Sequence, residues 1–138
     1  MTVTYAEALG KHNIALPDEL IADVEVPVIS GAQAQGDVGI FPVAPGTAMR
    51  TMEPVPAAGV IVVKGENTHI LDAYAGTVLW ARAPERQGGV TLGYLFVGDG
   101  GVATLTHTDE HTTNGIGAGT YRVTGKREQA DEIRRVAD

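Results

Sequence analysis

The chain has 138 residues, a formal net charge of −7 and no cysteine, with 43% hydrophobic and 20% charged residues. This composition fits one globular domain and excludes disulfides and thiolate metal sites. The acidic balance argues against nucleic acid or an anionic membrane surface as a partner, and no apolar run reaches the roughly 18 residues of a spanning helix. Because the N-terminus also lacks the order of a secretory signal, we expect a cytoplasmic protein.

The first part of the chain predicts an arm followed by a β-domain. Residues 1–23 are expected to form a short N-terminal arm, in which the stretch YAEALGKH can make a helical turn or two. Residues 24–138 are expected to form the β-domain, which ends in a short helix. The segment Val24–Ile29 has the composition of a strand, and Pro27, which lacks a backbone donor, favours an edge position.

Strand composition continues through the centre of the chain. Residues 36–43 predict a short strand, and the proline-rich residues 44–58 predict a loop. Val60–Val63 is a run of four β-branched residues, which is typical of a strand buried on both faces. Two further strands are expected over Thr68–Tyr74 and Thr77–Ala83.

The next segment predicts a hairpin. The glycine-rich turn GDGG joins two apolar stretches, VTLGYLFV and VATLTH, which is a local signal for paired neighbouring strands. A last strand is expected over Thr120–Thr124. Trp80, Tyr94 and Phe96 all lie on predicted strands, and we expect all three in the core.

The C-terminal segment differs from the rest. Ala130, Ile133, Val136 and Ala137 share one stripe, which predicts a short amphipathic helix docked on the sheet. Many short strands with turn signals about every ten residues indicate a mainly β protein. The predicted fold is a single small sandwich or barrel-like domain with a short N-terminal arm and a C-terminal amphipathic helix.

The stretch LTHTDEHTTNG contains the candidate metal ligands. His107, Glu110 and His111 have the H-x-x-E-H spacing of inverted zinc proteases, but the surrounding residues do not fit the helix that this chemistry needs. On a strand, His107, Asp109 and His111 would point to one side. With His69 from a neighbouring strand they would form a site for Zn, Mn or Fe, as in cupin-type barrels.

The same stretch has a second interpretation. It is polar, rich in threonine, and ends in Asn-Gly, which is typical of an exposed turn whose histidines are solvated or bonded to a neighbouring carboxylate. The sequence favours this interpretation, and therefore no cofactor. The alternative is one divalent metal held by His69, His107, His111 and Asp109.

Four short motifs connect the chain with other sequences. They are Gly-Asp-Val at residues 36–38, the T-H-x-x-x-H segment Thr106–His111, the Tyr-Arg-Val strand at residues 121–123 and the tail Ile133–Asp138. In these motifs the chain resembles a set of small, uncharacterised bacterial and phage-associated β-rich proteins. The set has no assigned activity, so the resemblance implies no catalytic residue.

Two functional hypotheses follow from the sequence. The first is a non-catalytic structural protein that forms a homo-oligomer or coats a larger, phage-like assembly as a decoration protein does, through its arm and its strand edges. Such a protein would be cytoplasmic or part of a virus-like particle assembled there. The second is a small metal-dependent cupin-like enzyme or sensor. The sequence favours the first, and it leaves open whether the arm docks on a neighbouring subunit or on its own sheet.

Overall fold

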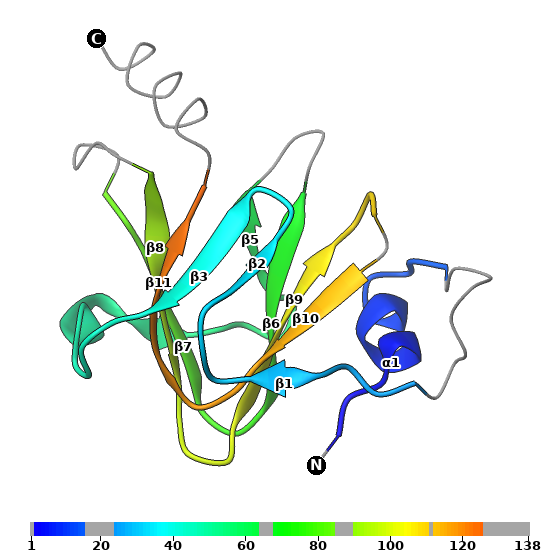
Figure 1. Cartoon of the computed structure of the whole chain (residues 1–138), viewed down its shortest axis with the longest axis horizontal. Helices are drawn as coiled ribbons and strands as arrows, with labels where there is room; N and C mark the ends of the chain where they lie inside the picture. The colour runs from blue at the N-terminus through cyan, green and yellow to red at the C-terminus, as the bar shows by residue number, and fades with distance from the viewer. Residues whose placement is uncertain (1, 16–23, 64–67, 85–89, 111, 126–138) are drawn as a thin grey trace, which may run out of the picture.

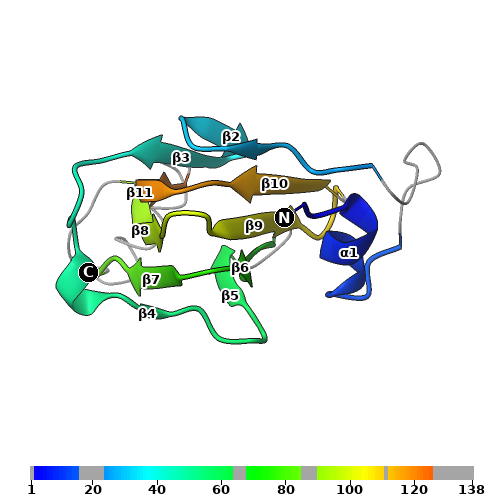
Figure 2. The ribbon, with the colours of Figure 1, turned by 90° about the horizontal axis from the view of Figure 1, so that it is seen from below.

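The computed structural model describes residues 2–15, 24–63, 68–84, 90–110 and 112–125. These residues form two β-sheets that pack face to face around one core, with an α-helix beside them (Figures 1 and 2). The five-stranded sheet has the order β1–β10–β9–β6–β5, and the six-stranded sheet has the order β2–β3–β11–β8–β7–β4. The predicted mainly β single domain is confirmed, and its architecture is a sandwich.

The chain builds the two sheets alternately, with the hairpins β5–β6, β7–β8 and β9–β10 in turn. All paired strands are antiparallel except β1, which runs parallel to β10. The five-stranded sheet consists of β1 (Val28–Ile29), β5 (Val60–Val63), β6 (His69–Ala75), β9 (Val102–His107) and β10 (Thr112–Ile116). The six-stranded sheet consists of β2 (Gln33–Gln35), β3 (Val38–Pro42), β4 (Glu53–Pro54), β7 (Val78–Arg82), β8 (Thr91–Val97) and β11 (Gly119–Thr124). The helices are α1 (Tyr5–Gly10) and the 3-10 helix η1 (Met49–Thr51).

The core is made of the side chains that alternate toward the space between the sheets. Leu71 and Leu105 come from the five-stranded sheet, and Leu95 and Tyr121 from the six-stranded sheet. Trp80 belongs to the same core, as predicted. A Cβ at Gly93 would lie 2.4 Å from the Trp80 ring, so a residue without a side chain is needed opposite the indole.

The prediction that Tyr94 and Phe96 are core residues was wrong. They alternate along β8 with Leu95 and Val97, which are buried between the sheets. Since successive side chains of a strand point to opposite faces, Tyr94 and Phe96 lie on the outer face of the six-stranded sheet, where both are half-buried. Both sets of β8 residues are apolar, so the sequence pattern alone could not tell the faces apart.

The predicted hairpin around GDGG was also wrong. β8 lies in the six-stranded sheet and β9 in the five-stranded sheet, so the turn carries the chain from one sheet to the other. The β6–β7 connection crosses beside it, and a Cβ at Gly76 would lie 2.8 Å from Cα of Gly101. The β6–β7 and β8–β9 connections touch at Gly76 and Gly101, and this close contact leaves no room for a side chain at Gly76. β9 instead pairs with the strand that follows it, β10, in the register His107 with Thr112.

The strand over Val60–Val63 was predicted to be buried on both faces, and this was wrong. It forms β5 at the edge of the five-stranded sheet, with Ile61 exposed. The strand whose residues are all buried is β9, in the middle of the same sheet. The edge position predicted from Pro27 is confirmed, because β1, which directly follows Pro27, is the edge strand on the opposite side of this sheet.

The N-terminal segment packs on its own chain. Thr4 and Glu7 form a capping box that fixes the start of α1. Val3 and Ala8 are buried in a second apolar cluster with Val102 of β9, and Figure 2 shows α1 at one end of the five-stranded sheet. The predicted C-terminal helix lies outside the residues that the structure describes. No helix in the part of the chain described here is long and apolar enough to span a membrane.

Candidate functional site

The first candidate site is a pair of buried histidines. His69 of β6 and His107 of β9 are direct cross-strand partners, and their ring centroids lie 4.5 Å apart in an edge-to-face arrangement. Their exposed fractions are only 1% and 2%. The interpretation of this stretch as a solvated turn was therefore wrong for His107. It was also wrong for the Thr-Thr-Asn-Gly residues that follow, because they belong to β10.

A buried amide from the opposite sheet holds His69. Gln35 of β2 donates from Nε2 to the carbonyl oxygen of Leu105 at 2.6 Å, and its Oε1 lies 2.9 Å from Nδ1 of His69. Because an amide oxygen can only accept, Nδ1 of His69 carries the proton and Nε2 of the neutral ring keeps the lone pair. Gln35 also donates to Oδ1 of Asn114 on β10 at 3.1 Å. The network joins the two sheets.

His107 has the opposite tautomer. The backbone N–H of Glu110 donates to its Nδ1 at 3.0 Å, so the neutral ring carries its proton on Nε2. A metal at Nε2 of His107 would require that proton to move to Nδ1, and the bond from Glu110 would then be lost. The pair therefore offers one ready lone pair, on Nε2 of His69.

The surroundings keep His69 uncharged. Burial, and next the positive charge of a protonated His107, lower the pKa of His69 from 6.5 to about 4. The carboxylates of Asp37, Glu110 and Asp109 act in the opposite direction, but they do not outweigh burial. At neutral pH His69 therefore takes part in the network as a neutral imidazole.

The structure brings only two of the four predicted ligands together. Asp109 is exposed in the β9–β10 turn, and His111 lies outside the described residues. Within the described ranges, no three histidine, cysteine, aspartate or glutamate side chains are grouped so that they could hold a metal. Metal binding by His69, His107, His111 and Asp109 stays a prediction.

A buried ionic cluster lies on the other face of β6, and the sequence reasoning missed it. Asp72 is buried, with Nζ of Lys11 2.9 Å from its Oδ1 and Nε2 of His12 2.6 Å from its Oδ2. Both partners follow α1 directly, so the cluster ties the end of the helix to the sheet. The signal was an aspartate in the middle of an apolar strand, which needs a partner when buried.

The second candidate site is a surface, which we name the edge patch. It consists of Val24, Val28 and Ile29, with exposed fractions of 38%, 43% and 45%. It borders a hollow of about 420 Å³ that includes Glu25 and Pro27 in its lining. Val28 and Ile29 are successive residues of β1 and point to opposite faces, so this edge carries exposed apolar side chains on both of its sides. Exposed apolar side chains concentrated in one segment are typical of contact sites.

The opposite edge of the same sheet is protected. Arg82 of β7 reaches across to β5, where its guanidinium donates to the carbonyl oxygens of Ile61 and Val62. A charged side chain over the edge of a sheet blocks the approach of another strand. The exposed Ile61 therefore lies beside a cation, whereas the edge patch has the anionic Glu25 as its neighbour.

The fold and these two sites define a β-sandwich with a polar network between its sheets and an apolar patch at one edge. The chain belongs to the family described as Domain of unknown function (DUF8820), whose model matches residues 34–126. The match runs from β2 to the end of β11 and includes His69 and His107, while α1 and the edge patch lie outside it. No curated protein and no solved structure matches the chain.

Proposed function

We propose that this protein is a non-catalytic structural protein that assembles with itself through the edge patch. The observation that carries the proposal is the concentration of Val24, Val28 and Ile29 on one six-residue segment, since these are three of the five large hydrophobic residues found exposed in the described chain. In a chain with a net charge of −7, that segment has one charged residue. A second copy of the chain is the partner we propose, because most soluble oligomers are made of identical subunits.

The N-terminal arm is no longer the preferred interface. In the described part of the arm, Val3, Ala8 and Leu9 are buried, and Val3 and Ala8 share a cluster with Val26 and Val102. The edge patch directly follows the arm in sequence and stays exposed. Assembly through a strand edge remains the mechanism that the sequence suggested.

The resemblance to phage-associated proteins extends this proposal. We propose that the assembly is, or coats, a larger particle formed in the cytoplasm, as a decoration protein does. A sandwich with one protected and one apolar edge suits this role, because it can join neighbours on one side without open-ended sheet growth. Co-sedimentation with particles from the same genome would test this step.

The test of self-assembly uses the two edges as a matched pair. Ile29→Thr removes apolar area from the edge patch, and Ile61→Thr makes the same change at an equally exposed position on the protected edge. In sedimentation velocity, wild type should form oligomers that Ile29→Thr weakens about tenfold or more, whereas Ile61→Thr should leave them unchanged. A monomeric wild type, or equal weakening by both variants, would contradict the proposal.

A metal-dependent function is the second proposal, and Nε2 of His69 is the observation that favours it. In this tautomer Nε2 is unprotonated and keeps its lone pair, and a second imidazole lies beside the ring. A bound metal would stabilise the fold by mass action, so zinc, manganese or iron should raise the melting temperature of untagged protein. His69→Gln should abolish that shift. No shift with any of the three ions, and no metal in the purified protein, would exclude it.

A further inference from the structure

An aromatic surface covers part of the outer face of the six-stranded sheet. We name it the outer aromatic face, and it consists of Phe41, Leu79, Tyr94, Phe96 and Arg122. Arg122 of β11 is the direct partner of Phe41 on one side and of Tyr94 on the other. Leu79 and Phe96 are partners in the next row. Direct partners on neighbouring strands share a face of the sheet.

This surface has the composition of a protein contact site. Phe41 is 43% exposed, and Arg122 is exposed as well. Aromatic residues and arginine are the residue types that supply most of the binding energy in protein interfaces. The chain has only two phenylalanines, and both lie on this face.

Arg122 restricts what can cover the outer aromatic face. The guanidinium of Arg122 forms no hydrogen bond or ion pair with any residue that the structure describes. A partner that covers the face must supply acceptors for the guanidinium, because an unpaired charge is costly to bury, and a carboxylate satisfies both its charge and its hydrogen bonds. The four other members of the face are apolar or aromatic, so two copies cannot meet face to face and satisfy their arginines. The complementary surface must be a different one.

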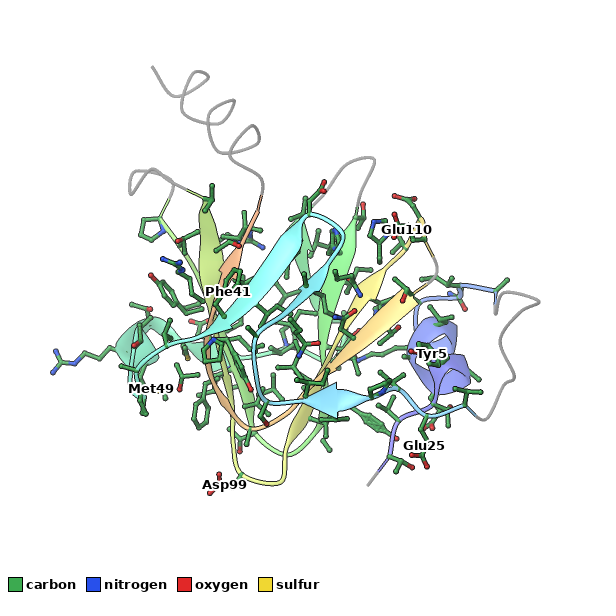
Figure 3. All side chains as sticks on the ribbon, viewed as in Figure 1. Tyr5, Glu25, Phe41, Met49, Asp99 and Glu110 are labelled. Atoms are coloured by element: carbon green, nitrogen blue, oxygen red, sulfur yellow. The ribbon has the colours of Figure 1, made fainter. Side chains whose placement is uncertain are left out.

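The hollow beside the edge patch supplies the required chemistry. Its lining includes Glu25 together with Pro27 and the exposed Val28 of the edge patch, and Val24 directly precedes Glu25 in the chain. The Glu25 side chain also has no hydrogen bond or ion pair with described residues. In Figure 3, Glu25 lies near α1 whereas Phe41 lies over β3, so the two surfaces belong to different parts of the molecule.

We propose that the edge patch of one copy receives the outer aromatic face of the next, with Glu25 paired to Arg122. This inference rests on the proposed self-assembly and names the second surface that the assembly uses. The contact is head-to-tail, because each copy contributes a different surface, and repetition gives a closed ring or a filament. Opposite charges at its centre set the register, and the surrounding apolar side chains exclude water.

The test exchanges the two charges. Arg122→Glu and Glu25→Arg should each weaken association about tenfold or more in sedimentation velocity, because each places like charges in contact. The double variant Glu25→Arg/Arg122→Glu restores the pair in reverse and should return to within about threefold of wild type. Arg50→Glu on η1, an exposed arginine that is not a member of the outer aromatic face, makes the same charge change and should have no effect.

The outcomes separate this inference from the function on which it rests. A monomeric wild type overturns both. Oligomers that Ile29→Thr weakens, but that the single charge variants change no more than Arg50→Glu does, retain self-assembly and overturn the Glu25–Arg122 contact. A double variant weaker than either single variant also overturns it. All three positions are exposed, and unchanged melting curves would show that the variants are folded.

Discussion

The outer faces of the two sheets differ, because the polar face is covered by the chain itself and the apolar face carries exposed side chains. The five-stranded sheet places polar side chains on its outer face, among them the buried Asp72 and Thr104, and the N-terminal segment lies over these two. The six-stranded sheet places aromatic side chains on its outer face, where Phe41 is exposed. The N-terminal segment binds the five-stranded sheet through an ionic cluster, whereas Phe41 on the outer face of the six-stranded sheet stays exposed among the described residues. The difference suggests that the second face is made for another molecule.

The largest expected effect comes from removing the cover. Leu9 is fully buried in α1, so Leu9→Ala should lower the free energy of unfolding by about 3 kcal/mol through lost burial and a new cavity. Urea unfolding at neutral pH measures this. Val24→Ala, at an exposed position, is the control and should cost far less. A loss below about 1 kcal/mol for Leu9→Ala would show that the helix adds little to the sheet.

The ionic cluster should contribute somewhat less. Asp72→Asn keeps the shape of the side chain but removes the charge that Lys11 and His12 face. We expect a loss of about 2 kcal/mol, less than for a fully enclosed pair because Lys11 is partly exposed. The exposed Asp99→Asn in the β8–β9 turn serves as the control. Equal stability of the two variants would mean that α1 is held by its apolar contacts alone.

The histidine network predicts a dependence of stability on pH. Since the pKa of His69 falls from 6.5 to about 4 on folding, the unfolded chain binds more protons between these values. Stability from this group is therefore complete above pH 6.5 and is lost as the pH falls toward 4, by about 1–2 kcal/mol between pH 6.5 and 5. His69→Gln should flatten this part of the curve. Parallel curves for the two proteins would contradict the assignment.

The smallest effect on stability is expected on the outer aromatic face. Phe41→Thr keeps a strand-forming residue at a half-exposed position and should change the free energy of unfolding by no more than about 0.5 kcal/mol. Association should nevertheless weaken, because the variant removes aromatic contact area. Chemical unfolding and sedimentation on the same samples separate the two effects. A large loss of stability with unchanged association would reverse the roles given to the two faces.

Local composition was sufficient to place most strands and the helical turn of the arm, but not to pair them. GDGG looks the same whether it joins partners in one sheet or carries the chain between sheets, and only the contact of Gly101 with Gly76 distinguishes the two. Likewise, β8 is apolar on both faces. Which face is inside depends on Trp80, which needs the space that Gly93 leaves.

The site was harder to predict because its parts are distant in sequence. The polar stretch around His107 is typical of an exposed turn, and only Gln35 and His69 from other strands make it a buried network. Asp72 acquires its meaning from Lys11 and His12, about sixty residues earlier. The edge position of the segment that carries the edge patch could be predicted from the sequence, because Pro27 favours an edge and the residues around it are apolar.

Hydrogen–deuterium exchange at low and high protein concentration tests the contrast between covered and uncovered surfaces most directly. If the protein assembles as proposed, raising the concentration should slow exchange in peptides that contain residues 24–29, 38–42 and 119–124. Exchange in residues 5–10 of α1 should stay the same at both concentrations, because that helix already packs on its own sheet. Exchange that is independent of concentration in all these segments, or a change confined to α1, would contradict the account.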